Sequence, residues 1–265
     1  MVEHSSMSLF GVPMEDMTVD EFLERIEQLI DRPEPALVSP INADQLNHCY
    51  ERRWLRDFIA GADLIHVDGA GVQLGLRLKG QHLRHKLSTN EIIYDLARRW
   101  EHSDYSIYFL GGPEGQAERA AQYLWRRFPK LNIIGWHHGY FPERDAASLI
   151  EQINALNPSV LFVGFGCPLQ EWWIRQHRER IRVPLVWPVG NLTSYLGNVP
   201  TAPLWMKRNG LEWVHRLALE PKRLWRRYLV GNPKFVWRVI KHERLHLPNP
   251  YWAKGEGKPA PRQVN

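Results

Sequence analysis

Residues 105–128 of the chain read YSIYFLGGPEGQAERAAQYLWRRF, and this stretch decides the fold class. The apolar and aromatic run Tyr105–Leu110 predicts a buried strand. The run Gly111–Gly115 predicts a tight turn, because glycine adopts backbone angles that other residues avoid. Apolar residues at helical spacing then predict a helix that ends near Phe128. A strand, a glycine turn and a helix in this order are typical of an α/β protein.

The same alternation continues on both sides of this stretch. Further strands are predicted at Ala36–Ser39, Leu64–Val67, Asn132–Trp136, Val160–Val163 and Pro184–Trp187. Further helices are predicted from Thr18 to about Asp31 behind a capping box, at 43–60 with a possible break, at 70–78, from Thr89 or Asn90 to Trp100, at 143–156 and at 168–180. This order predicts a Rossmann-like, mainly parallel sheet flanked by helices. Residues 1–200 are therefore predicted to form an α/β catalytic core.

The C-terminal part of the chain has a different character. The whole chain of 265 residues has a net charge of +5, but residues 201–254 hold 12 basic and 3 acidic residues, a net +9. Five of the 12 tryptophans fall in the same segment. Short basic helices are predicted there, at Leu211–Leu219, Lys222–Val230 and Lys234–Arg244. We therefore expect residues 201–250 to form a basic helical appendage for an anionic partner, a membrane surface or a nucleic acid, followed by a disordered tail at 251–265.

Several classes of protein are disfavoured by what the sequence lacks. The two cysteines, Cys49 and Cys167, are far apart and form no Cys-x-x-Cys pair, so we expect neither a disulfide framework nor a zinc site, and a reducing compartment fits best. Residues 1–8 carry no apolar core of signal-peptide length. No stretch reaches the roughly 20 apolar residues that span a bilayer. The 12 histidines form no His-Glu-x-x-His motif, so no metal site is expected.

One rim of the predicted sheet collects the candidate site residues, because the carboxyl ends of parallel strands lie together. Asp68 follows one strand and precedes Gly69, which lets a ligand or backbone approach closely. A carboxylate in this position can accept a proton from a substrate hydroxyl group. The alternative is that Asp68 only caps the helix that begins near Ala70. Asn42 follows the neighbouring strand and falls on the same rim.

Two glycine turns fall on this rim as well. Gly111 and Gly112 precede a helix N-terminus, which can bind a phosphate, although the run is neither a dinucleotide fingerprint nor a P-loop and can be a plain turn. Gly164 and Gly166 expose backbone before a second helix. Its first turn carries Gln170 and Glu171, which can hydrogen-bond the hydroxyl groups of a sugar. The alternative is an ordinary helix start, with the glutamate near the positive end of the helix dipole.

Three arginines of the appendage, Arg216, Arg223 and Arg226, are spaced seven and three residues apart. On one helix they share a face and can hold a diphosphate through paired hydrogen bonds. A solvated basic face, or a contact with anionic lipid, is the alternative. The chain contains no Asp-x-Asp motif to hold a metal ion against a diphosphate, so arginines or backbone dipoles must offset the charge of such a leaving group.

Taken together, these segments resemble the WecG/TagA/CpsF family of glycosyltransferases, from about Leu9 to Leu245. The residues that carry the resemblance are Asn42, Val67–Gly71, Phe109–Gly112, Gly135–Phe141, Gly164–Glu171, Gly210–Arg216 and Glu220–Arg226. The resemblance implies that an α/β core and a C-terminal appendage close the active site at the cytoplasmic face of the inner membrane. It implies sugar transfer from a UDP-sugar to an undecaprenyl-diphosphate-linked sugar, with inversion and without a metal or other cofactor.

The resemblance implies that the partners do not include a nucleic acid. It also assigns roles to individual residues. Asp68 corresponds to the proposed general base, and Gly69 adjoins it. Asn42 and Gln170 correspond to residues that line the substrate pocket. From their predicted place on the rim of the sheet, we expect the other substrate-binding residues to be Gly69, Gly111, Gly112, Gly164, Gly166 and Glu171. The diphosphate is expected to bind Arg216, Arg223 and Arg226.

The chain departs from the family pattern around the expected pocket. Pro40 stands where the family often has threonine, Leu169 stands where lysine is frequent, and Thr201 begins a segment that is Arg-Ala-Pro in the family. The donor sugar therefore stays open among N-acetylmannosamine, its uronic acid, glucose and galactose. The C-terminal segment resembles the exopolysaccharide glucosyltransferase branch of the family, and this resemblance favours a glucose donor. Two other classes remain as alternatives: a nucleotide-dependent oxidoreductase of doubly wound type, and a non-catalytic protein that binds membrane or nucleic acid.

Overall fold

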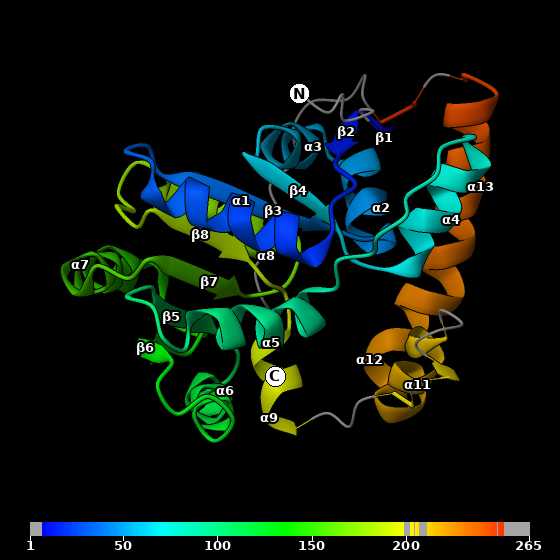
Figure 1. Ribbon diagram of the computed structural model, residues 1–265. Helices are drawn as coiled ribbons and strands as arrows, with labels where there is room; N and C mark the ends of the chain where they lie inside the picture. Colours follow the sequence, from blue (N-terminus) through cyan, green and yellow to red (C-terminus); the bar gives the residue numbers. More distant parts are fainter. Residues whose placement is uncertain (1–6, 199–201, 204, 207–210, 248, 252–265) are drawn as a thin grey trace.

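The computed structural model describes residues 7–198, 202–203, 205–206, 211–247 and 249–251. They form a six-stranded sheet between two layers of helices, with the C-terminal helices standing at one side (Figure 1). The strands follow the order β4-β3-β8-β7-β5-β6, and every neighbouring pair is parallel. The predicted Rossmann-like α/β fold is therefore confirmed.

The predicted strands of the sheet all form, with small shifts at their ends. They are β3 (Ala36–Ile41), β4 (Leu64–Val67), β5 (Ser106–Gly111), β6 (Asn132–His137), β7 (Val160–Gly164) and β8 (Leu185–Pro188). The core helices are α1 (Val19–Asp31), α2 (Ala43–Glu51), α3 (Arg53–Ala60), α4 (Ala70–Leu78), α5 (Thr89–Trp100), α6 (Gln116–Trp125), α7 (Ala146–Leu156, after the 3-10 turn Glu143–Asp145), α8 (Leu169–His177) and α9 (Leu192–Asn198). The predicted break inside 43–60 falls at Arg52, while α9 has no counterpart among the predicted helices.

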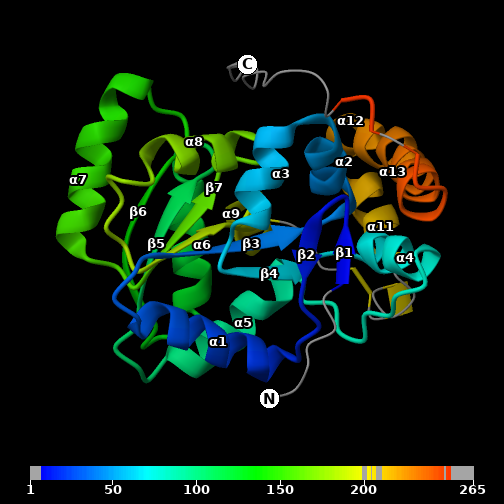
Figure 2. The ribbon, with the colours of Figure 1, turned by 90° about the horizontal axis from the view of Figure 1, so that it is seen from above.

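The two faces of the sheet are covered by different helices. Helices α1, α5, α6 and α9 cover one face, around large buried side chains such as Phe22, Trp100 and Trp187. Helices α7 and α8 cover the other face with Ile153 and Trp173, and α3 packs beside α8 (Figure 2). Burial on both faces explains why the strands are runs of apolar residues rather than alternating ones.

Strands β3 and β8 separate toward their carboxyl ends. They pair only at Ala36 and Leu37, and from Val38 onward β3 pairs with β4 alone. Pro40 lies in the part of β3 that no longer pairs with β8, and it has no backbone N–H to donate to a neighbouring strand. Strands β3 and β8 are neighbours in the sheet, but the loop after β3 leads to α2 and the loop after β8 leads to α9, and these two helices lie on opposite faces. Ligands of open α/β sheets bind at such a point, so the fold itself indicates where a site belongs.

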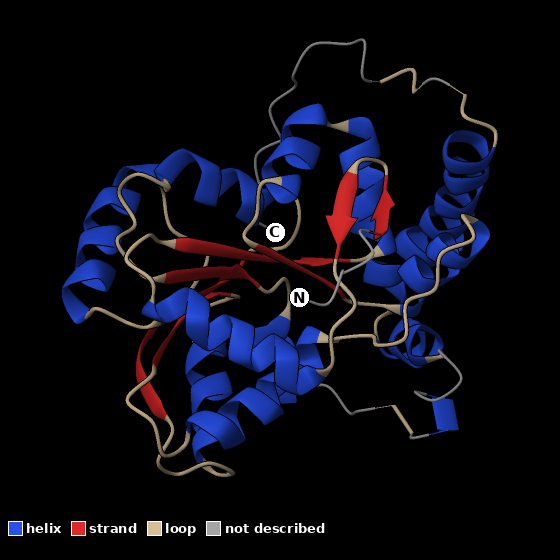
Figure 3. Ribbon diagram, turned by 45° about the horizontal axis from the view of Figure 1, so that its top comes forward, coloured by secondary structure: helices blue, strands red, loops and turns tan. Residues whose placement is uncertain are grey.

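The C-terminal helices and a hairpin near the start of the chain pack together against α2, α3 and α4. The appendage consists of α11 (Glu212–Leu219), α12 (Pro221–Trp225), the π-helical segment Arg226–Gly231, α13 (Asn232–Val239) and a second π-helical segment Ile240–Arg244. The hairpin, β1 (Met7–Leu9) and β2 (Val12–Met14), is separate from the main sheet (Figure 3). Phe235 and Val239 of α13 lie in one apolar core with Leu9 and Phe10 of the hairpin. The appendage thus completes a second core of the protein.

Polar contacts fix α13 to α2. Arg238 is only 4% exposed. It donates hydrogen bonds to the backbone and side-chain oxygens of Asn47, at 3.0 and 2.9 Å, and to Glu51 at 2.6 Å. Its guanidinium carbon lies 4.3 Å from the centre of the Tyr50 ring. Lys234 adds a second ion pair with Glu51 at 2.7 Å, so the helix is held by charges as well as by apolar packing.

Candidate active site

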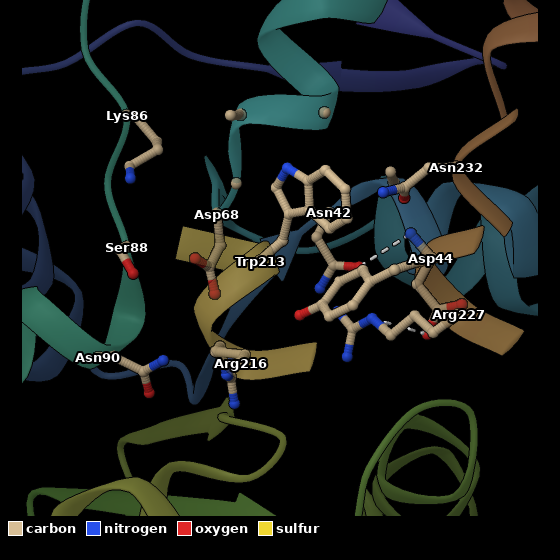
Figure 4. Close-up of a pocket in the computed structure, with 15 residues that line it drawn as sticks. Asn42, Asp44, Asp68, Lys86, Ser88, Asn90, Trp213, Arg216, Arg227 and Asn232 are labelled. Atoms are coloured by element: carbon tan, nitrogen blue, oxygen red, sulfur yellow. Dashed lines mark hydrogen bonds and ion pairs between the residues drawn. The ribbon is translucent and has the colours of Figure 1, made fainter. Parts of the chain in front are cut away.

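Two adjoining cavities of about 770 and 1020 Å3, both open to solvent, lie at the carboxyl edge of the sheet. The first lies between the start of α4, the segment 86–90 and the appendage (Figure 4). The second lies at the ends of β3, β7 and β8, where β3 and β8 separate. The residues that line both cavities are Asn42, Asp44, Asp68, Asn90, Arg216 and Arg227. The two cavities therefore form one cleft with a shared wall.

Asp68 lies on this shared wall, directly after β4. Its backbone N–H continues the pairing of the sheet by bonding the Ile41 carbonyl oxygen at 2.9 Å. Its carboxylate accepts a hydrogen bond from the Thr89 hydroxyl at 3.3 Å. Helix α4 begins after Gly69, whose φ of 129° favours glycine, and no side chain caps the helix. The capping alternative for Asp68 is therefore wrong, and its carboxylate faces the cleft (Figure 4).

The surroundings of Asp68 raise the pKa of its carboxyl group above the ordinary value. Removal from water is the largest cause, and it outweighs the opposing effects of the Lys86 charge, a hydrogen bond from Ser88 and the Arg216 charge. A carboxylate with a raised pKa is a stronger base, which suits it to take a proton from a hydroxyl group.

Asn42 and Gln170 line the cleft, but most of their hydrogen bonds go to the protein. The Asn42 side chain caps α2 by accepting from the N–H groups of Asp44 and Gln45, at 3.0 and 3.1 Å. The side-chain oxygen of Gln170, Oε1, accepts hydrogen bonds from the backbone N–H groups of Gly166 and Gly190, at 3.1 and 3.0 Å. Gln170 thereby ties the loops after β7 and β8 together. Both residues shape the cleft. Only the hydrogen-bonding capacity that these protein contacts do not use is available to a ligand.

Glu171 is not placed to contact a ligand in this cleft. It is fully buried and lines neither cavity, and burial raises the pKa of its carboxyl group. One carboxylate oxygen accepts a hydrogen bond from the Gln170 amide at 2.8 Å. Because adjacent residues of a helix point about 100° apart, only Gln170 reaches the cleft. The predicted contact between Glu171 and a sugar is therefore wrong. Glu171 instead holds the Gln170 side chain in place through their hydrogen bond.

Some of the predicted site glycines line the cleft, and the others serve the packing of the sheet. Gly111, Gly112 and Gly164 line neither cavity. A Cβ atom on Gly111 would lie 2.5 Å from the Gly164 oxygen, so the close approach of β5 and β7 requires glycine. The N-terminus of α6 is covered by α9, where Ser194 accepts a hydrogen bond from Gln116 at 2.6 Å. This placement favours the plain-turn alternative over a phosphate site, whereas Gly166 and Gly69 do line the cleft.

The three predicted arginines do not share one helix face. Glu220, with φ −130° and ψ 58°, separates α11 from α12, because the residue before a proline disfavours helical angles. Arg216 on α11 lines both cavities, and its buried Nε has no hydrogen-bond partner among the described residues. Arg226 is exposed and lies over the Trp225 ring, while its neighbour Arg227 lines both cavities. The Arg223 side chain lies outside the described residues.

Several cleft residues were missed by sequence reasoning. They are Asp44, Lys86, Ser88, Asn90 and Arg227. Lys86, Ser88 and Asn90 belong to a polar run around the start of the helix predicted from Thr89 or Asn90 to Trp100. This run lies at the rim of the sheet, and it was the signal that could have found these three residues. The buried His66 positions this run, since the Leu87 carbonyl oxygen lies 2.8 Å from His66 Nδ1.

The described residues also give two negative findings. Across these ranges no group of three or more His, Cys, Asp or Glu side chains is arranged to hold a metal ion. No helix in the described part of the chain is long and apolar enough to cross a bilayer.

Fold and site together define an α/β protein with a basic, two-chambered cleft around a carboxylate, suited to substrates that carry hydroxyl groups and negative charge. The model of the glycosyl transferase WecG/TagA/CpsF family matches residues 7–248. The chain belongs to this family and is a glycosyltransferase. The sequence resemblance is thereby confirmed, and the oxidoreductase and non-catalytic alternatives are wrong.

Relatives with a known activity align with most of the chain. An N-acetylglucosaminyldiphosphoundecaprenol N-acetyl-beta-D-mannosaminyltransferase of Bacillus subtilis (strain 168) is 27% identical over 89% of this chain and 92% of its own length. Proteins of the same name from Bacillus spizizenii and Staphylococcus aureus (strain NCTC 8325) are 28% and 26% identical, over 86% and 91% of this chain and 88% and 94% of their own lengths. These relatives are mannosaminyltransferases, so they do not support the glucosyltransferase preference.

Proposed function

We propose that the chain transfers a sugar from a UDP-sugar to a sugar linked to undecaprenyl diphosphate, with inversion and without a metal. The observation that carries this proposal is the position of Asp68 on the wall shared by two cavities. A transferase must bring a donor and an acceptor together at one base, and two adjoining chambers provide room for both. The names of the relatives, which act on N-acetylglucosaminyldiphosphoundecaprenol, support the acceptor.

In the proposed reaction Asp68 accepts the proton of the acceptor hydroxyl group as its oxygen attacks the anomeric carbon of the donor. The bond from the anomeric carbon to the diphosphate oxygen breaks, and UDP leaves with that electron pair. Fixed cations stabilise the charge that develops on the leaving group. Arg216 is placed for this role, because it lines both chambers and has a buried N–H without a partner among the described residues. Arg223 and Arg226 stay predictions for the same group.

For the donor sugar we propose N-acetylmannosamine ahead of glucose. The relatives transfer N-acetyl-beta-D-mannosaminyl groups, and they align with nine tenths of this chain. The side chains of Asn42, Asn90 and Asn191 in the cleft are neutral hydrogen-bonding groups of the kind that bind sugar hydroxyl and acetamido groups.

We propose further that the appendage binds the surface of the membrane that holds the acceptor, on its cytoplasmic side. Of the 13 large apolar side chains exposed among the described residues, ten belong to the segment from residue 205 onward, including Trp237 at 64% and Leu229 at 57%. Exposed tryptophan beside basic residues suits the headgroup region of an anionic bilayer. The two free cysteines, Cys49 and Cys167, fit a reducing compartment.

The reaction is tested with Asp68→Asn. We expect UDP release in the presence of donor and a short-chain lipid-diphosphate-GlcNAc acceptor to fall roughly 100- to 10,000-fold, while UDP binding measured by calorimetry is kept. Asp57→Asn, which removes an exposed carboxylate on α3, serves as the control and should keep full activity. Turnover of Asp68→Asn near the wild-type rate would refute the base. A panel of UDP-sugars in the same assay tests the donor, and faster turnover of UDP-glucose than of UDP-N-acetylmannosamine would overturn that choice.

Membrane binding is tested by co-sedimentation with vesicles that contain anionic phospholipid. The double variant Leu229→Ser and Trp237→Ser should bind less than the wild type, because both side chains are exposed on the appendage. Leu156→Ser, at a 50% exposed apolar position on α7, is the control. Equal binding of the double variant and this control would contradict the proposed surface.

A further inference from the structure

We propose that Arg227 binds the diphosphate group of the substrate, and that Asp44 is the partner that holds the Arg227 side chain in the cleft until that group arrives. The identity of the anion rests on the proposed function, whereas the anion-binding role of Arg227 rests on the structure of the cleft.

The local structure of the appendage turns Arg227 toward the cleft. Arg227 belongs to the segment Arg226–Gly231, whose backbone has π-helical hydrogen bonds. A π-helical turn holds more residues than an α-helical turn and shifts the direction in which side chains project, and such turns are frequent at functional sites. Arg226 lies over the Trp225 ring at 5.3 Å, outside the cleft, while Arg227 lines both chambers.

The contact between Arg227 and Asp44 is a weak one. The Arg227 Nε lies 3.5 Å from a single Asp44 carboxylate oxygen, and the two side chains are 34% and 31% exposed (Figure 4). An ion pair with this exposure changes an equilibrium constant by less than about fivefold. A diphosphate can offer two oxygens to the same guanidinium group, which gives shorter and stronger bonds. An entering diphosphate can therefore displace the carboxylate.

Asp44 can lose this partner without being left in an unfavourable place. It lies in the first turn of α2, where the helix dipole favours a negative charge. The backbone N–H of Asp44 is held by the Asn42 side chain at 3.0 Å, so the residue keeps its position when the ion pair opens.

The charges of the whole cleft point to an anion as the ligand. The lysine and arginine side chains that line the two chambers are Lys86, Arg216 and Arg227, and the carboxylates are Asp44 and Asp68. The buried Arg216 Nε lacks a hydrogen-bond partner among the described residues, and an unpaired buried donor is costly unless a ligand satisfies it. Because Arg216 and Arg227 both line the shared wall, an anion between them lies beside Asp68, where a leaving diphosphate belongs.

The test measures binding of UDP and of inorganic pyrophosphate by calorimetry. Wild type, Arg227→Gln, Arg227→Lys, Asp44→Asn and the double variant Asp44→Asn with Arg227→Gln are compared. The control is Lys222→Gln, which removes a positive charge from an exposed position of α12. Circular dichroism melting identifies any variant that fails to fold, and Arg227→Lys keeps the charge if the glutamine variant does not.

We expect Arg227→Gln to weaken both probes by roughly 10- to 100-fold, the loss typical of a hydrogen bond to a charged group, with Lys222→Gln unchanged. Asp44→Asn should tighten pyrophosphate binding by about two- to fivefold, and only when Arg227 is present.

Three outcomes overturn the inference. Binding of both probes by Arg227→Gln as tightly as by Lys222→Gln would remove Arg227 from the anion site. Weaker binding by Asp44→Asn would make Asp44 a ligand contact rather than the resting partner of Arg227. Wild type that binds neither probe would show that the cleft takes no such anion. If wild type binds pyrophosphate but not UDP, the proposed donor is wrong while the anion site at Arg227 stands.

Discussion

Replacement of Arg238 by alanine tests how firmly the appendage is held to the core. Arg238 is buried between α13 and α2, where it contacts Asn47, Glu51 and the ring of Tyr50. Burial disfavours the charge of Glu51, but hydrogen bonds from Lys234 and Arg238 lower the pKa of Glu51 below its ordinary value. Glu51 is therefore charged at neutral pH, so its contact with Arg238 is an ion pair.

The expected cost follows from burial. Removing one partner of a buried ion pair costs about 3–5 kcal/mol. Because Glu51 keeps its bond to Lys234, we expect the lower end, about 3 kcal/mol, or roughly a 100-fold rise in the opening of α13. Lys234→Ala breaks only a half-exposed pair with Glu51 and should cost less than about 1 kcal/mol.

Hydrogen–deuterium exchange of the α13 peptide, residues 232–239, measures this opening directly. Exchange in Arg238→Ala should rise far above that in Lys234→Ala, and thermal unfolding should move down by roughly 6–12 °C. If the two variants exchange alike, the buried cluster does not hold the appendage and the reasoning fails.

Three further predictions concern stability and pH. Burial lowers the pKa of His66 to about 4, so its ring stays neutral in the folded protein while the unfolded chain takes up a proton near pH 6.5. The free energy of unfolding, measured by urea titration, should therefore fall by about 3 kcal/mol between pH 6.5 and 4. In His66→Gln the free energy of unfolding should depend less on pH, and an unchanged pH dependence would argue against this role of His66. Gly75→Ala should cost about 1–3 kcal/mol in denaturant unfolding, because its Cβ would lie 2.8 Å from Phe235, and a neutral effect would show that the ring yields freely. Since only ionised Asp68 accepts a proton and its pKa is raised, kcat/KM should drop as pH falls through a value above 3.8, the ordinary aspartate value, and a limb at or below that value contradicts the assignment.

The sheet and its rim were predictable from sequence because their signals are local. Val160–Gly164 is an apolar run bounded by turn residues, and the structure pairs it on both sides within the sheet. Asp68 and Asn42 follow such runs directly, so parallel topology alone places them on one rim. The order of the strands, and hence the separation of β3 from β8, has no local signal.

Two features could not be predicted from local sequence patterns: which arginines of the appendage reach the cleft, and the hairpin that packs against it. A helical spacing rule assumes one uninterrupted α-helix, but the break at Glu220 and the π-helical segment after Trp225 put Arg227 rather than Arg226 in the cleft. The hairpin Met7–Met14 has strands of three residues each, too short for a periodic pattern. It packs against α3, α4 and β4, and also against Phe235 and Val239, which lie more than two hundred residues away along the chain.

That pairing of distant segments has a consequence for synthesis on the ribosome. The hairpin leaves the ribosome among the first folded segments, yet the cover of Leu9 and Phe10 is incomplete until α13 follows. Even the backbone N–H of Phe10 has its partner in Glu243, at 2.6 Å. For nearly the whole of translation the nascent chain therefore presents an open apolar surface beside α4, and surfaces of this kind are where chaperones bind and where incomplete chains aggregate. Truncated products that end before α13 should accumulate in inclusion bodies even though the parallel sheet itself is complete.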